Sequence, residues 1–418
     1  MDGNCSSPWV KIMRACRQGR FWSTIRQRLH PMIAGARYAF VNLAAGKIQL
    51  HWPAYVEPDP EEREIVVRIF KAFQRMKKDE AGAPAWYAPA PMWRQLLDHA
   101  YAQPISAAAN GDVAAFHQFL ANFGAWETYL GIDAPVLREA RRSWLGRRYL
   151  ENDIFGKQLA CWQWFYNGRK QLAALTQPRI GNQAGALING VFVTAGAFFN
   201  EVYGSLLSEL VRDVERPVIA ELGAGYGKLA HFLVRHLNAC TYVDFDLPEI
   251  LCVAAYYLMR SFPEKHVLLY GEEPYSDATH GRYDLIFMPA YEMPKVGSSS
   301  VELFLNKNSL GEMSREAIEQ YVAIIARSTR YFFHLNHDVY PNIYDNGERS
   351  LLGYEYPVPP GQFKLVFRYP DLGHLYGSGR LDFRSDIFAY LYERMSGHCA
   401  VNQQPSAMAT VWGGKYVS

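Results

Sequence analysis

The chain has 418 residues, of which 49% are hydrophobic and 20% are charged, and its formal net charge is +2. This length exceeds one ordinary compact core, so we expect two domains or one domain with a large extension. The composition is typical of a soluble globular protein, and the lack of any run of about 18 apolar residues predicts no membrane-spanning helix.

The six cysteines lie far apart in the sequence, and none of them forms a CxxC pair. This scatter predicts neither a zinc site nor a disulfide framework. A reducing compartment fits unpaired cysteines best, so we expect a cytoplasmic protein without a bound metal.

Residues 1–56 contain eight Lys or Arg and a single acid, Asp2, whereas the rest of the chain has 35 basic and 40 acidic residues. We interpret residues 1–56 as a basic helical arm. Such an arm can lie on an anionic membrane or dock on a protein partner. It also has the Arg-rich, acid-poor composition of a transit peptide, and the simplest alternative is a solvated helical arm.

Residues 51–63, HWPAYVEPDPEER, read as a linker because three prolines precede an acidic cluster that suits a helix start. We expect a helical cap or substrate domain over residues 57–200. Apolar residues recur there at steps of three and four, which predicts helices at 62–76, 91–103 and 112–124. The first clear strand signal is ALINGVFVTAG at 186–196.

After residue 215, apolar strand-like runs alternate with helix-like runs, which indicates parallel strands joined by crossover helices. The fold class we predict is α/β, with a doubly wound, Rossmann-like sheet over residues 201–396, a helical N-terminal extension and a C-terminal tail over residues 397–418. The expected strands are at 217–225, 240–246, 265–271, 282–291 and 330–338, and a closing hairpin is expected from 354–358 and 363–370.

The first of these strands runs into a glycine-rich turn, ELGAGYG, at the edge where doubly wound sheets bind ligands. Gly223 and Gly225 fit the dinucleotide pattern GxGxxG, but its third glycine would stand at Lys228, and the chain has Gly227 instead. The pattern ExGxGxG resembles motif I of class I S-adenosylmethionine (SAM)-dependent methyltransferases. This resemblance implies that the three glycines form the cofactor loop and that Glu221 holds the loop or the cofactor's ammonium group.

The second strand ends in acids, and Asp246 lies 21 residues after Gly225. A carboxylate at that position can accept two hydrogen bonds from a ribose diol. Leu247, the next residue, is also a candidate for cofactor binding. Asp244 has the same parity and competes for this role, and Asp246 could instead cap the helix that follows. The third strand ends in YGEEP, where Gly271 and Glu272 are candidates for the adenine edge. YDLIFMPAY, at 283–291, resembles the fourth-strand motif, whose end faces the transferred methyl group.

Several segments together resemble the sugar O-methyltransferase family, over roughly residues 90–395. They are MWRQLLDHAY at 92–101, the run from PRIGN to LLSEL at 178–210, the glycine turn, DFDLPEIL at 244–251 and FLNKNSLGEM at 304–313. The resemblance implies a SAM-dependent O-methyltransferase that acts on a sugar hydroxyl in a glycan or a glycosylated small molecule, with SAM as its cofactor and a sugar-containing acceptor as its partner.

A sugar hydroxyl is a poor nucleophile while protonated, so a general base at the cofactor edge is expected. HLNHD, at 334–338, ends the fifth predicted strand, and His337 is the first choice for this base, with Asp338 to orient it. These residues could instead cap the next turn, and a metal role for His334, His337 and Asp338 has no support from their spacing.

A second candidate base is Glu312 in NSLGEM, although Ser309 and Glu312 also have the spacing of a capping box. Tyr203, before the glycine turn, is either a lid over the cofactor or part of the core.

Two further classes stay open. The acceptor could be a phenol or another small molecule, and the chain could be a non-catalytic SAM-binding subunit. A nucleic-acid methyltransferase is not expected, because the predicted catalytic domain is net acidic and only the arm is basic.

Overall fold

The computed structural model describes residues 29, 31–36, 38, 47–52, 54–125, 140–343, 347–371, 373, 375 and 385–395. Most of the predicted arm and the whole predicted tail lie outside these residues. Of the arm, residues 31–36 are helical, but residues 48–51 form a strand, β1 (Ile48–His51), and not a helix. The prediction of a helical arm is therefore wrong for this stretch, where residues 48–51 pair with a strand of the later chain.

The helices follow the apolar periodicity of the sequence. In α3 (Arg63–Asp79), for example, Val66, Ile69, Phe70, Phe73 and Met76 are buried at steps of three and four, and this stripe packs on α12. The other helices are α4 (Pro91–His99), α5 (Ala102–Ala109), α6 (Val113–Ala121), α8 (Trp144–Tyr149), α9 (Gln158–Phe165), α10 (Ala197–Glu209), α11 (Lys228–His236), α12 (Pro248–Ser261) and α13 (Arg315–Ser328).

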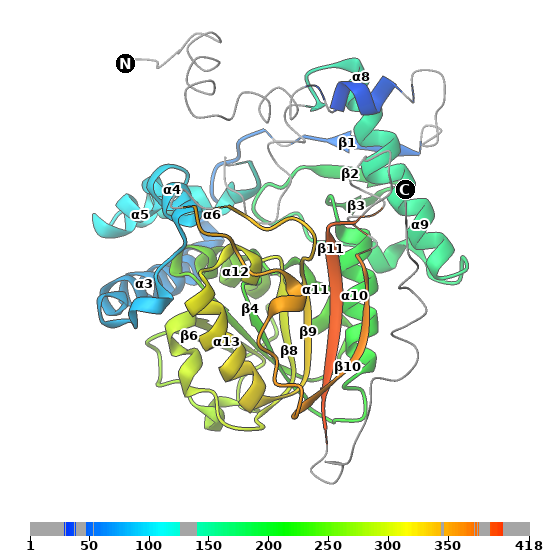
Figure 1. Cartoon of the computed structure of the whole chain (residues 1–418). Helices are drawn as coiled ribbons and strands as arrows, with labels where there is room; N and C mark the ends of the chain where they lie inside the picture. The colour runs from blue at the N-terminus through cyan, green and yellow to red at the C-terminus, as the bar shows by residue number, and fades with distance from the viewer. Residues whose placement is uncertain are drawn as a thin grey trace, which may run out of the picture.

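A small antiparallel sheet joins the two ends of the helical region. β1 pairs with β2 (Gly185–Ile188), and β2 pairs with β3 (Val191–Val193). In Figure 1 this sheet and α8 lie above the large sheet, and α3 to α6 lie beside it. The strand signal in residues 186–196 is thus confirmed.

The large sheet has eight strands in the order β10-β11-β9-β8-β4-β5-β7-β6. All neighbours from β6 to β9 are parallel, and the hairpin of β10 and β11 adds an antiparallel edge. Helices lie around this sheet (Figure 1), so the predicted α/β doubly wound class is confirmed. The strands are β4 (Val218–Leu222), β5 (Thr241–Asp246), β6 (Val267–Leu269), β7 (Leu285–Pro289), β8 (Val301–Lys307), β9 (Thr329–His337), β10 (Phe363–Pro370) and β11 (Ile387–Arg394).

Two strand predictions need correction. The neighbour of β4 on the far side from β5 is β8, which was not predicted as a strand. The strand predicted over 282–291 is confirmed as β7, and it lies between β5 and β6. The closing hairpin uses 363–370 as predicted, but its other arm is β11, while 354–358 has no strand.

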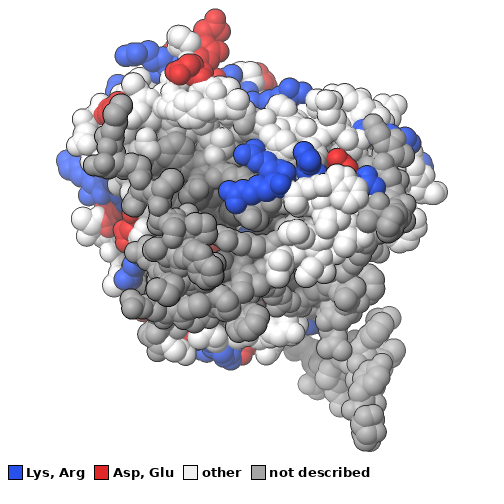
Figure 2. All heavy atoms as spheres, turned by 90° about the horizontal axis from the view of Figure 1, so that it is seen from above, with Lys and Arg blue, Asp and Glu red and all other residues white. Residues whose placement is uncertain are grey.

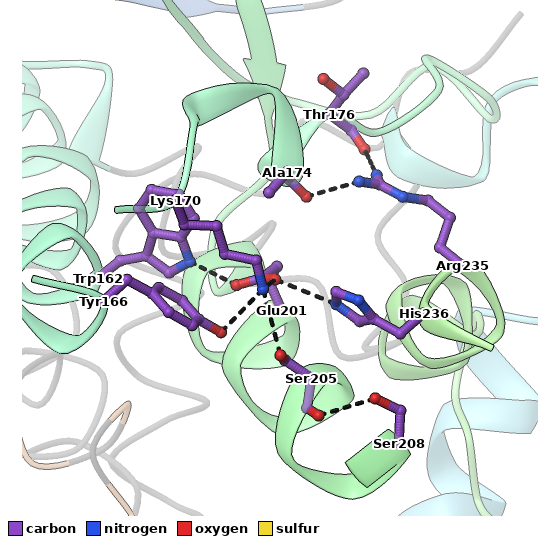
Figure 3. Close-up of polar contacts among 10 residues, drawn as sticks. All are labelled: Trp162, Tyr166, Lys170, Ala174, Thr176, Glu201, Ser205, Ser208, Arg235 and His236. Carbon is purple, nitrogen blue, oxygen red and sulfur yellow. Dashed lines mark hydrogen bonds and ion pairs between the residues drawn. The ribbon is translucent and has the colours of Figure 1, made fainter. Parts of the chain in front are cut away.

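A buried polar cluster joins α9, α10 and α11 (Figure 3). Glu201 on α10 is fully buried; it accepts a hydrogen bond from Trp162 Nε1 at 2.6 Å and lies 2.5 Å from Lys170 Nζ and 3.2 Å from His236 Nε2. Burial acts to raise the pKa of Glu201, but these donors outweigh it and lower the pKa. The cluster therefore holds a charged carboxylate that ties three helices together.

The end of the molecule above the large sheet carries basic side chains. Figure 2 looks onto this end and shows Lys and Arg grouped near its middle. The end includes α8, whose last turn contains Arg147 and Arg148. In the part of the chain that the structure describes, no helix is both long and apolar enough to cross a membrane.

Candidate functional site

A cavity of about 220 Å³ opens at the carboxyl ends of β4, β5 and β8. The sheet order reverses at this point, since the chain runs from β4 to β5 on one side and later returns to β8 on the other. The walls of the cavity come from the glycine turn, the loops after β5, β7 and β8, and residues of the helical region. They include Tyr87–Ala90, Trp93, Asn200, Glu221–Tyr226, Asp246, Leu247, Ala290 and Lys307–Ser309.

The glycine turn has the conformation that its residue types allow. Gly223, Gly225 and Gly227 have φ angles of +77°, +62° and +88°, in the left-handed region that favours glycine. Gly223 and Gly225 line the cavity, whereas Gly227 precedes the first residue of α11 and packs on Leu258. A Cβ on Gly223 would lie 2.2 Å from Ser309 Oγ. Two glycines therefore face the cavity, and the third supports the turn.

Asp246 and Asp244 differ in their position relative to the cavity. Asp246 lines it, and its two carboxylate oxygens accept hydrogen bonds from the amides of Gly225 at 3.2 Å and Leu247 at 2.7 Å. Asp244 is fully buried and is not part of the lining. Asp246 does not cap α12, which begins at Pro248 with Leu247 as its N-cap. Each Asp246 oxygen keeps a lone pair for a ligand hydroxyl.

Burial in the site changes the acidity of these groups. It raises the pKa of Asp246 to about 7, against the hydrogen bonds from Leu247 and Gly225. It also raises the pKa of Glu221 to about 7, against a hydrogen bond from Tyr242. That bond, from Tyr242 Oη to Glu221 Oε2, is 2.5 Å long. Glu221 thus holds the end of β4 against β5 and also reaches the cavity wall.

Asn200 on α10 is a lining residue that the sequence reading missed. Its side chain is only 5% exposed, and its Nδ2 donates to the carbonyl oxygen of Gly196 at 2.8 Å. Among the described residues, its Oδ1 has no hydrogen-bond partner. A buried acceptor without a partner costs free energy, so this atom is suited to a donor group of a ligand in the cavity.

Gly271 and Glu272, which were predicted to lie at the adenine edge, do not line the cavity. They follow β6, and β7 separates β6 from β5. Glu272 forms an ion pair with Arg68 of α3, with Arg68 Nε 2.9 Å from its Oε1. The loop after β7 takes the place beside β5 and contributes Ala290.

Glu312 lies in the short helix Leu310–Glu312 after β8 and lines the cavity. Its Oε2 accepts a hydrogen bond from Trp93 Nε1 of α4 at 2.8 Å, so it is not half of a capping box with Ser309. Ser309 Oγ donates to the Leu222 carbonyl instead. Burial raises the pKa of Glu312, although the hydrogen bond from Trp93 opposes this, as does His337 in its protonated form.

His337 is the last residue of β9 and lies at the edge of the site. It is not in the cavity lining, but its Cδ2 is 3.5 Å from where a Cβ on Gly311 would stand, next to Glu312. Its Nδ1 lies 2.6 Å from Oδ2 of Asp386, which precedes β11. Burial alone would raise the pKa of Asp386, but His337 and the amides of Tyr340 and Val339 lower it.

Asp338 was expected to orient His337, and that prediction is wrong. The Asp338 carboxylate forms an ion pair with Arg368 and accepts a hydrogen bond from Tyr390 Oη at 2.7 Å. Asp386 takes the orienting position because the antiparallel pairing of β11 with β9 sets Ile387 opposite His337. Asp338 instead links β9 to the closing hairpin.

Two other residues singled out in the sequence belong to the core. His334 is fully buried and stacks on Tyr390, with ring centroids 4.6 Å apart. Tyr203 is 3% exposed and donates to Asp371 at 2.7 Å, so it is not a lid. No three His, Cys, Asp or Glu side chains of the described residues are grouped so that they could hold a metal ion.

Solved methyltransferase structures match about half of the chain, at low similarity. The mitomycin 7-O-methyltransferase is 11% identical and covers 47% of this chain and 57% of its own length, at a TM-score of 0.29. The 1,6-didemethyltoxoflavin-N1-methyltransferase of Burkholderia thailandensis, with bound S-adenosylhomocysteine, is 16% identical and covers 47% of this chain and 79% of its own, at 0.31. The magnesium protoporphyrin IX methyltransferase of Synechocystis, with bound SAM, is 12% identical. It covers 48% of this chain and 81% of its own length, at a TM-score of 0.30.

Similarity at this level carries no argument about the cofactor or substrate of this chain, and the match spans less than two thirds of the mitomycin enzyme. No family model matches the sequence, and no curated protein matches it.

Proposed function

We propose that the chain is a SAM-dependent O-methyltransferase and that its acceptor is a sugar hydroxyl in a glycan or a glycosylated small molecule. One observation supports the cofactor above all. The turn of the ExGxGxG motif places two left-handed glycines in the wall of a cavity that Asp246 and the unpartnered Oδ1 of Asn200 also line. The sugar acceptor rests on the sequence resemblance and is the finer part of the proposal.

The residues of the cavity suit the polar groups of SAM. Asp246 keeps lone pairs for the two ribose hydroxyls, and Gly223 and Gly225 let the cofactor approach the backbone closely. Asn200 Oδ1 and the Glu221 carboxylate are the acceptors available for its ammonium group. A dinucleotide is less well accommodated, because Lys228 occupies the place of the third glycine and its Nζ donates to the Ala195 carbonyl.

When bound, SAM supplies an activated methyl group on a sulfonium centre. The protein must then hold the acceptor hydroxyl and remove its proton. The contact with Asp386 keeps a proton on Nδ1 of His337, so Nε2 is free to accept the proton of the hydroxyl. Trp93 fixes the Glu312 carboxyl at the wall of the cavity, where it can bind a neighbouring hydroxyl.

Isothermal titration tests the cofactor directly. Purified protein is titrated with SAM, S-adenosylhomocysteine and NAD, and the same is done for Gly225→Val. We expect micromolar binding of the first two ligands only, and loss of this binding in the variant, because φ at Gly225 is +62°. Binding of NAD alone, or of none of the three, would overturn the proposal.

The acceptor is tested next, with tritiated SAM and a panel of sugars, glycosides and phenols. Transfer to a sugar hydroxyl supports the finer proposal. Transfer to phenols only would replace it, and cofactor binding without transfer to any acceptor would favour a non-catalytic subunit.

A further inference from the structure

A second cavity, of about 550 Å³, adjoins the first. Both cavities are lined by Ala88, Pro89 and Ala90, so this short segment is their common wall. On the other side, Met313 lines the first cavity and the next residue, Ser314, lines the second. The two cavities are therefore neighbours, separated by this segment.

The second cavity has a mixed polar lining with one large aromatic ring. Its larger side chains are Trp86, Arg94, Arg315, Glu316, Glu348 and Arg349. Guanidinium groups only donate hydrogen bonds and carboxylates only accept them, whereas a hydroxyl does both. A wall with both types therefore suits a group with many hydroxyls. A simple anion would face two carboxylates, and a simple cation would face three guanidinium groups.

The arginines differ in how much of their bonding capacity is used. Arg349 is held by Glu355 through two bonds of 2.6 Å and 2.7 Å. Arg94 uses Nε for the carbonyl of Pro89, at 2.9 Å. Arg315 is the first residue of α13. Among the described residues its guanidinium makes no hydrogen bond or ion pair, although its charge helps to lower the pKa of the Glu355 carboxyl. Arg315 and the terminal nitrogens of Arg94 are thus available to a ligand.

An aromatic contact joins the linings of the two cavities. The rings of Trp86 and Tyr321 meet edge to face, with centroids 5.0 Å apart and an interplanar angle of 86°. Trp86 lines the second cavity and Tyr321 the first. A ring held in this way offers a rigid apolar surface at low entropic cost.

We infer that the second cavity binds a neutral saccharide unit of the acceptor, adjacent to the unit that carries the methylated hydroxyl, through Trp86, Arg94 and Arg315. The acceptor is then an oligosaccharide or glycoside of at least two units. That the bound saccharide is a methyl acceptor rests on the proposed function. The binding of a saccharide in this cavity does not require methyl transfer.

The test uses the full-length protein on an array of defined neutral and anionic oligosaccharides and their component monosaccharides, with saturating S-adenosylhomocysteine. The affinity for each bound glycan is then measured by titration for the wild type, Arg315→Gln and Trp86→Phe. Arg212→Gln is the matched control, because Arg212 is an exposed arginine in the turn after α10 that pairs with Glu209. Thermal unfolding shows whether each variant is folded, and Arg315→Gln is the main variant because it leaves the Trp86–Tyr321 contact intact.

We expect the wild type to bind neutral oligosaccharides at least tenfold more tightly than their monosaccharides. Arg315→Gln should weaken this binding about tenfold without changing the affinity for S-adenosylhomocysteine, and Arg212→Gln should change neither. Three outcomes would overturn the inference: an affinity for neutral glycans that Arg315→Gln does not change, binding of anionic glycans only, or no glycan binding. Glycan binding that depends on Arg315 in a protein that fails to bind SAM would instead support the second cavity and overturn the methyltransferase proposal.

Discussion

His337 Nδ1 lies 2.6 Å from Asp386 Oδ2, although the two residues are 49 positions apart in the sequence. This pairing fixes the tautomer of the imidazole and leaves Nε2 as its acceptor. We predict that His337→Ala lowers kcat by about 10²- to 10⁴-fold and that Asp386→Asn gives a smaller loss, since the base stays but its orientation is no longer held. Steady-state kinetics with the identified acceptor measures both.

The control for this pair is Glu393→Gln. Glu393 lies on β11, the strand that Asp386 precedes, and its carboxylate accepts a hydrogen bond from Tyr331 at 3.0 Å. It should leave kcat unchanged. If Asp386→Asn weakens cofactor binding as much as it lowers kcat, its role is structural and not the positioning of His337.

The second prediction concerns Gly223, whose φ is +77° and whose added Cβ would lie 2.2 Å from Ser309 Oγ. Gly281 has a φ of +79° but has open space where its Cβ would be. We expect Gly281→Ala to cost about 1–2 kcal/mol of unfolding free energy from backbone strain alone. Gly223→Ala should cost more and should also lose cofactor binding. Urea unfolding and titration compare them, and equal losses would contradict the close approach of Ser309.

The third prediction is a pH dependence of cofactor affinity. The pKa of Asp246 in the protein is about 7, and the ionised carboxylate is the better acceptor for a ribose diol. Affinity for S-adenosylhomocysteine should therefore rise with pH up to about 8 and fall below pH 7. Asp246→Asn should bind about 1.5–3 kcal/mol more weakly at pH 8, the usual worth of a hydrogen bond to a charged group, and should show a flatter profile.

Titration from pH 5.5 to 8.5 measures this effect. The exposed Asp213, which lies 3.9 Å from Arg330, provides the control variant Asp213→Asn, for which the wild-type profile is expected. A profile for Asp246→Asn as steep as that of the wild type would assign the titration to another group, with Glu221 first among them because its pKa is also about 7.

The fourth prediction concerns acid stability. Burial lowers the pKa of His334 from 6.5 to about 3, so below pH 6.5 the unfolded chain binds a proton that the folded protein does not. This makes the folded state about 2 kcal/mol less stable at pH 5 than at neutral pH. His334→Phe keeps a ring between Tyr390 and Tyr356 and should remove that loss.

Unfolding midpoints at pH 5 and 7.5 test this, with the exposed His266→Asn as the control. His231, whose pKa burial lowers to about 4, adds a loss of the same sign, while Asp246 acts in the opposite direction because its pKa is raised. The loss of stability between pH 7.5 and pH 5 is compared for His334→Phe and the wild type, which isolates the contribution of His334. An equal loss in both proteins would contradict the assignment of this loss to His334.

Local patterns allowed the central part of the fold to be predicted. The strand, turn and helix around Gly223 and Gly225 form within about 20 consecutive residues, and Asp246 follows at the next strand end. Their proximity follows from parallel strands ending at one edge. The apolar stripe of α3 could be read for the same reason, since its period is set by the helix itself.

Pairings between distant segments could not be read in this way. Asp386 reaches His337 only through the register of β11 against β9, and Asn200 reaches the cavity only because α10 packs on α11. The position of β7 between β5 and β6 depends on which edge a crossover selects, and this position keeps Gly271 and Glu272, which follow β6, away from the cavity. Sequence spacing carries no information on such choices.

The pairing of β1 with β2 has a consequence for how this protein tolerates change. Residues 51 and 185 are partners in an antiparallel ladder, so the chain between them is a loop with its two ends fastened together. The entropic cost of closing such a loop grows only slowly with its length. Extra residues inserted at an exposed turn of this segment should therefore cost little, and a backbone cut there should leave two fragments that stay joined.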